Sequence, residues 1–409
     1  MTNQSIIGDA YLIMKAAVEA VLPDAAVERA LKAYRGNDPV TLIAIGKAAW
    51  RMAGAAYRAI GEDRVKQGAV ITKYGHSEGN IGCLEIYEAG HPVPDENGVK
   101  AAERVLQMAE GLTAADWVIL LISGGGSALF ECPADGVTLE DIARITRQLL
   151  ACGADIREIN CIRKRLSKVK GGRLGLALSP AKVFSILLSD VLGDPPDAIA
   201  SGPACPDAAT CVQAGEIIAK YRLQLSPGAL SALNTETPKA LPGVETVIAG
   251  NVHALCAAAA RAAEGIGYPA RIMDEALCCE AREAGKMMAE YARKTPGPCA
   301  LIWGGETVVH VKGGGKGGRN QEAALSAAEG IAGMGDTCIF ALGSDGTDGP
   351  TDAAGGIVTG DFYQAAGGEK IRAHLENNDA YPLLKEMNGL IVTGPTGTNV
   401  NDLYMLIKR

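Results

Sequence analysis

The chain has 409 residues, 48% of them hydrophobic and only 4% aromatic, with 51 glycines. This length predicts two domains, and the abundance of small residues is typical of α/β proteins. The formal net charge of −8 argues against a nucleic-acid binder, because recognition of the phosphate backbone needs an excess of Lys and Arg on one face.

The amino-terminal segment MTNQSIIGDAYLIMKAAVEAV lacks the charged stretch and continuous apolar block of a signal peptide. Its apolar residues recur at helical spacing and predict an amphipathic helix: Ala10, Ile13, Met14, Ala17, Val18 and Val21. The longest apolar runs, such as WVILLI, are too short to span a bilayer. The eleven cysteines form no C-x-x-C pair, which indicates reduced thiols. We therefore expect a soluble, cytoplasmic protein without a membrane partner.

Short apolar segments alternate with Ala-rich helical segments along the chain, and the apolar segments end in Gly or Asp. Examples are VTLIAIG, WVILLISGGG, FSILLSD and CIFALGSD. This alternation predicts an α/β fold with two α/β/α three-layer domains and mostly parallel sheets. Ligands of such sheets bind outside the carboxyl ends of the strands.

A cluster of Thr, Pro and Gly in NTETPKALPGVET, residues 234–246, predicts the domain boundary. We expect an amino-terminal Rossmann-like domain over 1–236 and a carboxy-terminal domain over 237–409. The last strand, near 389–409, can return to the first domain.

Lys47 directly follows the predicted strand VTLIAIG. At the end of a strand its ammonium could neutralise a phosphate or a carboxylate. A solvated surface lysine fits the sequence equally well.

The segment SGGGSALF, residues 123–130, predicts a phosphate-binding loop, because its backbone N–H groups and hydroxyls precede a helix. The candidate residues are Ser123, Gly124, Gly125, Gly126 and Ser127. A strand-to-helix turn without a ligand is the alternative. Within SGGGSALF the G-x-G-x-x-G fingerprint breaks at Leu129, and Ser127 does not stand in a G-x-S-x-G nucleophile elbow. Neither Lys47 nor Lys316 is followed by the Ser or Thr of a Walker A loop.

The basic segment RKRLSKVKGGRLG occupies residues 163–175. We expect Arg163, Lys164 and Arg165 to form a solvated helix face. The glycines of KGGR bring the backbone close to a ligand, so Lys170 is a candidate for phosphate binding. The same four letters recur at 316–319, ending in Arg319.

Two aspartate clusters follow predicted strands. The first contains Asp190, Asp194 and Asp197, and the second contains Asp345, Asp348 and Asp352. Each aspartate could simply form a turn. Together they suggest a Mg²⁺ site with Asp190, Asp345 and Asp348 as ligands, or a base for a substrate hydroxyl. Glycine loops, cations and aspartates fit phosphoryl transfer best, and so a kinase of a small molecule.

Six segments in order resemble the glycerate 2-kinases, which pair an amino-terminal domain of once-unknown function with a MOFRL domain. They are LLISGGGSALF, KRLSKVKGGRLG, LLSDVLGDPPDAIASGP, GGETVVHVKGGGKGGRNQE, LGSDGTDGPTDAAGG and GPTGTNVNDLYMLI. The resemblance covers nearly the whole chain. It departs from the family at RKRLS, where relatives often have KHLS.

The resemblance implies phosphorylation of D-glycerate at its C2 hydroxyl by ATP and Mg²⁺, giving 2-phosphoglycerate, in a cleft between two α/β/α domains. Motif positions match Lys47 and Arg319 to the family's essential lysine and arginine. We expect these cations to hold the substrate carboxylate and the transferring phosphoryl group. Asp190 or Asp345 would accept the C2 proton or bind Mg²⁺, and the SGGGS loop would bind nucleotide phosphates.

Two other functions stay open at this point. An NAD(P)H-dependent hydroxypyruvate reductase would need an intact dinucleotide fingerprint, which breaks here at Leu129. A non-catalytic protein that binds anionic metabolites would have little use for two aspartate clusters. The sequence also leaves open the acceptor hydroxy acid, the preferred phosphoryl donor and whether the chain forms a homodimer.

Overall fold

The computed structural model describes residues 3–36 and 39–409 and divides the chain into two compact units. Unit 1 contains the amino-terminal segment up to Ala25 together with Gly250–Arg409. Unit 2 is the continuous segment Ala26–Ala249. Each unit contains one six-stranded sheet.

The sheet of unit 2 has the strand order β3-β2-β1-β4-β5-β6. Its first five strands in this order are parallel neighbours. The strands are β1 (Val40–Ile45), β2 (Val65–Lys73), β3 (Glu85–Ala89), β4 (Trp117–Ile122), β5 (Lys182–Leu188) and β6 (Val244–Gly250). Because β1, β4 and β5 lie side by side and run the same way, the loops that follow them meet at one edge.

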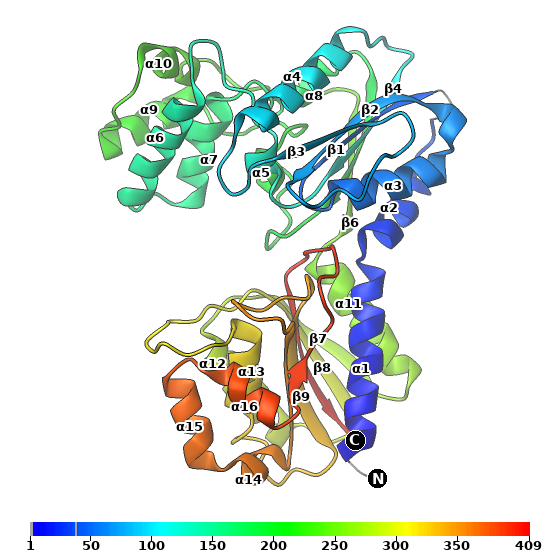
Figure 1. Ribbon diagram of the computed structural model, residues 1–409, viewed down its shortest axis with the longest axis vertical. Helices are drawn as coiled ribbons and strands as arrows, with labels where there is room; N and C mark the ends of the chain where they lie inside the picture. The colour runs from blue at the N-terminus through cyan, green and yellow to red at the C-terminus, as the bar shows by residue number, and fades with distance from the viewer. Residues whose placement is uncertain (1–2, 37–38) are drawn as a thin grey trace. The chain divides into compact units, whose positions relative to one another are not determined.

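Both faces of this sheet are buried under helices (Figure 1). Ile43 and Ile45 of β1 belong to the core under α4 (Glu96–Glu110) and α8 (Arg173–Ala177). The intervening residues Leu42 and Ala44 belong to the core under α2 (Pro23–Leu31) and α3 (Ala49–Ile60). Burial on both faces explains why the strands are continuously apolar.

Unit 2 also contains a helical cluster with its own core, which the sequence analysis did not predict. The cluster consists of α6 (Leu139–Ala151), α7 (Ile156–Arg165), α9 (Cys211–Tyr221) and α10 (Pro227–Leu233). Capping boxes begin three of these helices, at Thr138, Asp155 and Thr210. The short helix α5 (Gly126–Leu129) and the 3₁₀ turn η2 (Ile199–Ser201) lie next to one another, and η2 also contacts α7.

The sheet of unit 1 has the order β11-β10-β9-β12-β8-β7. The strands are β7 (Ala270–Leu277), β8 (Cys299–Gly305), β9 (Thr337–Gly343), β10 (Gly355–Thr359), β11 (Leu390–Ile391) and β12 (Asp402–Lys408). Strands β7, β8, β9 and β11 run in one direction, whereas β10 and β12 run against them. Because β12 lies between β8 and β9, its first residue stands at the edge where those two strands end.

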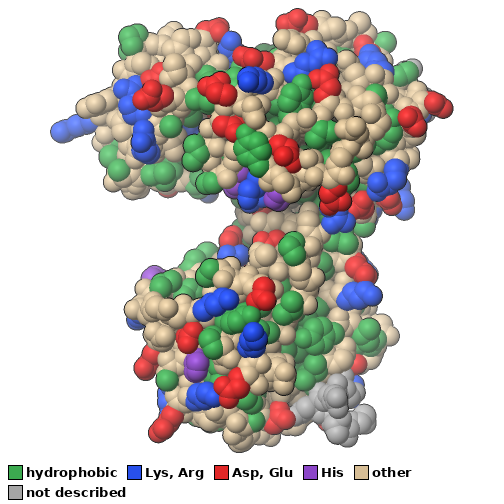
Figure 2. Space-filling view, viewed as in Figure 1, with side chains coloured by type: hydrophobic (Ala, Val, Ile, Leu, Met, Phe, Trp, Pro, Cys, Tyr) green, Lys and Arg blue, Asp and Glu red, His purple; other side chains and the backbone are tan. Residues whose placement is uncertain are grey.

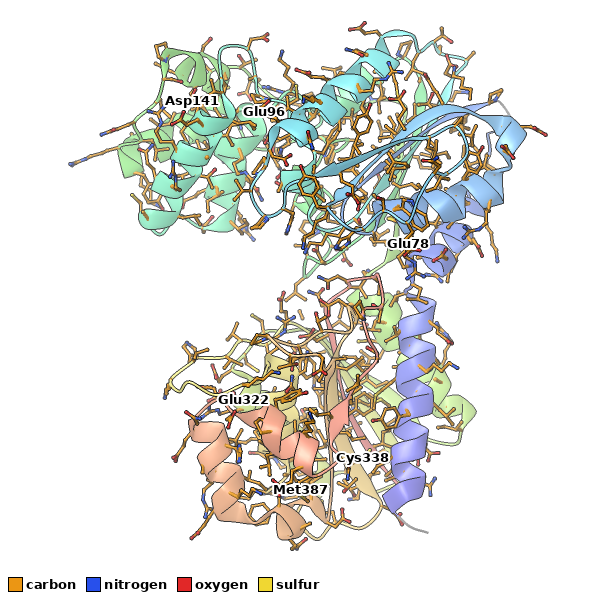
Figure 3. All side chains as sticks on the ribbon, viewed as in Figure 1. Glu78, Glu96, Asp141, Glu322, Cys338 and Met387 are labelled. Atoms are coloured by element: carbon orange, nitrogen blue, oxygen red, sulfur yellow. The ribbon has the colours of Figure 1, made fainter. Side chains whose placement is uncertain are left out.

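Helices cover both faces of the second sheet as well. One face packs against α1 (Asn3–Ala20) and α11 (Val252–Gly265), and Cys338 of β9, labelled in Figure 3, is buried in that core. The other face packs against α12 (Ala281–Lys294), α13 (Arg319–Ala327) and α16 (Ala380–Glu386), with α14 (Phe362–Ala366) and α15 (Gly368–Glu376) nearby. The predicted α/β class with two sheets, each covered by helices on both faces, is thereby confirmed. Four of the six strands of the second sheet run in one direction, and β10 and β12 are antiparallel to their neighbours.

The predicted amphipathic helix near the amino terminus is confirmed as α1, and all six of its predicted apolar residues are buried. It packs on α11 and β9, and so it belongs to unit 1. The predicted boundary at 236/237 differs from the structure, because β6 completes the first sheet. Strand β12 stays in the second sheet. Among the described residues, no helix has the length and apolarity needed to cross a membrane.

Candidate active site

The loops after β1 and β4 join at the edge of the unit 2 sheet. The Lys47 backbone N–H donates to the Gly124 carbonyl at 2.9 Å, and the Ala48 N–H donates to Ser123 Oγ at 3.1 Å. Asp190 follows the neighbouring strand β5. The structure therefore brings together Lys47, the SGGGS loop and Asp190, as the strand-end positions predicted.

The glycines of this loop are closely surrounded by functional side chains. A Cβ added to Gly124 would lie 2.2 Å from Asp190 Oδ2. A Cβ added to Gly125 would lie 3.1 Å from both Lys47 Cγ and His91 Cδ2, and Gly125 also has a φ of +83°. Larger residues would displace these side chains, so the glycines leave room for a carboxylate, an ammonium and an imidazole around the loop.

Two histidines near Lys47 were missed by the sequence analysis. His91 follows β3, and a ring nitrogen of His76 lies 3.3 Å from the Lys47 carbonyl oxygen. Burial lowers the pKa of His91, and the positive charges of Lys47, Lys73 and His76 lower it further. His and Lys or Arg side chains meet on this part of the unit 2 surface (Figure 2). The strand-end position that singled out Lys47 could also have found His91.

Asp190 has a mostly buried carboxylate. Burial raises the pKa of Asp190, and the charge of Lys47 opposes that effect. The carboxylate is therefore a stronger base than an exposed aspartate while it keeps a cation nearby. Such a group can accept a proton or bind a metal ion.

Two residues that we expected to bind phosphate, Ser123 and Lys170, are buried and bonded to other protein groups. The Ser123 hydroxyl is buried and accepts the Ala48 N–H. Lys170 is fully buried, forms an ion pair with Glu131 and donates to the Phe130 carbonyl at 3.2 Å. Neither side chain can reach a phosphate in this arrangement, because each is enclosed by its protein partners.

The predicted solvated face of Arg163, Lys164 and Arg165 is also wrong, because α7 is packed on several sides. Lys164 pairs with Asp197 at 3.0 Å and with Asp207 at 3.1 Å. Arg165 has no exposed surface and lies 3.2 Å from a Glu236 oxygen and 3.6 Å from an Asp207 oxygen. Asp197 of the first aspartate cluster thus belongs to a structural ion-pair network.

Arg319 begins α13 in unit 1 and forms a two-pronged ion pair with Asp402. Its Nε and Nη2 donate to the two carboxylate oxygens at 2.5 and 3.1 Å, and its Nη1 lies 3.1 Å from Glu306 Oε1. Burial lowers the pKa of Arg319, but the hydrogen bond and charge of Asp402 outweigh it and leave the pKa raised. The side chain is 35% exposed. Arg319 is therefore a fixed, permanently charged cation that solvent can reach.

Asp402 and Glu306 were not singled out from the sequence. Asp402 is the first residue of β12, and Glu306 directly follows β8. Burial raises the pKa of Asp402, while Arg319 acts in the opposite direction. A carboxylate at a strand end was a usable signal, but the antiparallel insertion of β12 was needed to bring it to Arg319.

The glycine-rich segment before Arg319 packs closely against the α15–α16 connection. Added Cβ atoms at Gly313 and Gly315 would lie 2.3 and 2.6 Å from the Asn377 carbonyl oxygen. Lys316 places its Nζ 4.3 Å from the Tyr381 ring centre and donates its backbone N–H to Asp379. These glycines therefore permit backbone packing and fix the start of α13.

The second aspartate cluster divides into two roles. Asp345 follows β9, is partly exposed and accepts the Thr347 N–H at 2.9 Å. Asp348 is 3% exposed and accepts the N–H groups of Asn320 and Gln321 at 3.1 and 2.8 Å. Asp348 therefore holds the first turn of α13, and its role as a metal ligand stays a prediction. Over the described residues, no three His, Cys, Asp or Glu side chains form a group that could hold a metal ion.

Comparison with known proteins covers almost the whole chain. Residues 9–234 match the domain of unknown function DUF4147, and residues 299–402 match the MOFRL family. D-glycerate 2-kinase of Thermotoga maritima is 52% identical over 96% of each chain, and glycerate 2-kinase of Pyrococcus horikoshii is 40% identical over 92% of this chain and 89% of the relative. The crystal structure of Thermotoga maritima glycerate kinase superposes with a TM-score of 0.96 at 50% identity, covering 99% of this chain and 100% of that chain. The chain belongs to the glycerate 2-kinase family.

Proposed function

We propose that this protein is a cytoplasmic D-glycerate 2-kinase that transfers a phosphoryl group from ATP to the C2 hydroxyl of D-glycerate. The observation that carries the proposal is the 52% identity to a D-glycerate 2-kinase over 96% of the chain. The grouping of Lys47, Gly124, Gly125 and Asp190 supports it, because phosphoryl transfer depends mainly on positioning and charge stabilisation. All eleven cysteines are free thiols, which agrees with a reducing compartment.

The group in unit 2 supplies charge stabilisation and a base. The Lys47 ammonium and the backbone N–H groups around Gly124 and Gly125 bind phosphoryl oxygens. Asp190 accepts the proton of the C2 hydroxyl as its oxygen attacks the terminal phosphorus and the bond to the departing ADP oxygen breaks. His91 is a second candidate for the base, since its lowered pKa keeps the imidazole neutral at physiological pH.

The group in unit 1 supplies a pre-oriented guanidinium. Asp402 fixes the plane of Arg319, and the exposed part of Arg319 binds a carboxylate or phosphoryl oxygen of the reactants. Fixing the guanidinium beforehand reduces the entropy lost when the substrate binds.

Mg²⁺ fits the carboxylates that both groups offer. Asp190 and Asp345 each present a partly accessible carboxylate, and Mg²⁺ is commonly held by one or two carboxylates together with water and substrate phosphate oxygens. Asp190 or Asp345 would hold the ion. When bound, it would neutralise phosphate charge.

The proposal is tested by measuring ADP release with D-glycerate and separating 2-phosphoglycerate from 3-phosphoglycerate. We expect Lys47→Ala and Arg319→Ala each to lower turnover about 100-fold or more, as loss of a charge-stabilising donor typically does. Lys100→Ala and Arg372→Ala remove exposed cations and should change turnover little. Near wild-type turnover of both Lys47→Ala and Arg319→Ala would contradict the assignment.

The reductase alternative has a direct test of its own. The protein is mixed with hydroxypyruvate and NADH or NADPH, and the absorbance of the reduced cofactor is followed. We expect no consumption of the cofactor. Turnover with hydroxypyruvate in the absence of ATP would replace the kinase proposal.

A further inference from the structure

Arg163 of α7 is a mostly buried cation beside the SGGGS loop. Its Nη2 donates to the Ser127 carbonyl oxygen at 3.3 Å. Its Nε is inaccessible to solvent and has no hydrogen-bond partner among the described residues. Within residues 3–36 and 39–409, no carboxylate oxygen lies within 4 Å of its guanidinium nitrogens. Figure 1 shows α7 and α5 close to one another in unit 2.

The neighbouring charges are already neutralised by protein partners. Lys164 pairs with two aspartates, and Arg165 pairs with Asp207 and Glu236. Glu131, whose charge acts on Arg163, is fully buried in its ion pair with Lys170. A buried guanidinium without an anionic partner costs free energy. An anion from solution would remove that cost.

The surroundings of Arg163 are polar and conformationally strained. Ser127 Oγ lies 2.8 Å from Ser201 Oγ, and Ser201 donates to Asn160, one turn before Arg163 on α7. Ala200 and Ser201 have φ values of +51° and +61° although neither is glycine. Strain of this kind persists where the surrounding structure enforces it, often at functional sites.

The KGGR loop holds the strained segment in place. The Gly171 N–H donates to the Ser201 carbonyl at 3.0 Å, and the Gly172 N–H donates to the Gly202 carbonyl at 2.8 Å. With Lys170 buried, this loop acts as a support for Ser201. Of the three cations of α7, Lys164 and Arg165 are paired with carboxylates, whereas Arg163 has no carboxylate within 4 Å among the described residues.

From these contacts we propose that Arg163 binds a phosphoryl group beside Ser127. Its Nη1 makes no hydrogen bond to the described residues, so the outer edge of the guanidinium remains available to a tetrahedral oxyanion. The inference rests on the proposed kinase function, which supplies two sources for this group: ATP or ADP, and 2-phosphoglycerate.

The test compares Arg163→Gln with Arg157→Gln, which removes an exposed arginine from the same helix. The dissociation constants of ADP and of 2-phosphoglycerate are measured separately by calorimetry in the absence of D-glycerate. We expect Arg163→Gln to weaken at least one of them about tenfold or more. Arg163→Lys should restore part of the loss, and Arg157→Gln should leave both constants unchanged. The ligand that loses affinity identifies the source of the phosphoryl group.

Stability of the ligand-free protein separates binding from a structural role. Because Arg163 is mostly buried and has no acidic partner in the described part of the chain, Arg163→Gln and Arg163→Met should have a Tm no lower than that of Arg157→Gln. A clear fall in the Tm of both variants, or unchanged constants for both ligands, would overturn the inference. Arg163-dependent ADP binding without transfer to D-glycerate would instead refute the proposed function and leave the inference standing.

Discussion

The carboxylate of Asp348 lies among the first backbone N–H groups of α13, where burial and hydrogen bonding have opposite effects on its pKa. Burial raises the pKa of Asp348 to about 6, although N–H groups of Asn320 and Gln321 favour the charged form. Desolvation outweighs the hydrogen bonds because the side chain is almost fully enclosed. The start of α13, and therefore Arg319, is held by a carboxylate that is close to its protonation range.

This raised pKa predicts a measurable pH dependence of stability. The folded state binds a proton at Asp348 more tightly than the unfolded state, so the stabilisation is present below pH 3.8 and is lost as the pH rises through 6. The free energy of unfolding of the wild type, minus that of Asp348→Asn, should increase by about 1 kcal/mol from pH 7 to pH 5. Urea titrations at the two pH values measure this difference. A constant or opposite difference would show that hydrogen bonding outweighs burial.

The SGGGS loop is the element in which backbone shape and function are most closely linked. Gly125 has a φ of +83° and lies next to both Lys47 and His91. An alanine in this left-handed conformation would cost about 1–2 kcal/mol of stability. Its Cβ would also lie in tight contact with the side chains of Lys47 and His91. Gly153, after α6, has a φ of +73° but nothing within 4 Å of an added Cβ.

We therefore expect Gly125→Ala and Gly153→Ala to lower stability by comparable amounts, whereas only Gly125→Ala lowers kinase turnover, by about tenfold or more. Thermal unfolding and the ADP-release assay measure the two effects. Equal turnover in the two variants would mean that the space above Gly125 has no part in the reaction.

Helices and strands could be predicted where the pattern of apolar residues within the segment was sufficient to define them. The strands before Lys47, Ser123 and Asp190 were predicted from their apolar runs, and the structure confirms them as β1, β4 and β5. The basic run on α7 failed because a charge pattern does not show which acidic side chains will surround it. Glu322, labelled in Figure 3, illustrates the same limit: a polar residue of RNQE is buried in an ion pair with Arg282.

At the scale of the whole molecule, the amino-terminal helix α1 belongs to unit 1 although unit 2 follows it in the chain. Ile13 of α1 has no exposed surface and lies in the core shared with α11 and β9, whereas the adjacent Leu12 is 59% exposed. The stability of unit 1 therefore depends on residues of α1 that are separated in the sequence from the rest of the unit by more than 200 positions.

We expect Ile13→Ala to destabilise unit 1 by about 2–5 kcal/mol, the usual cost of removing a large aliphatic side chain from a core. Hydrogen exchange should show lower amide protection for β8, β9 and β12, while β1, β4 and β5 change little. Leu12→Ala is the control and should alter neither set. Equal loss of protection in both sheets would show that the two units unfold together.

The sequence by itself determined the α/β class, the strand ends that carry Lys47 and Asp190, and the motifs of the glycerate 2-kinase family, because these depend on local patterns. Tertiary structure alone decided which charged side chains are enclosed. It buried Lys170 and Asp348 and brought Asp402 to Arg319 through the antiparallel strand β12. It also left Arg163 without an acidic partner among the residues that the structure describes. The physical reason is that the role of a charge depends on its burial and its partners, and both come from segments distant in the chain.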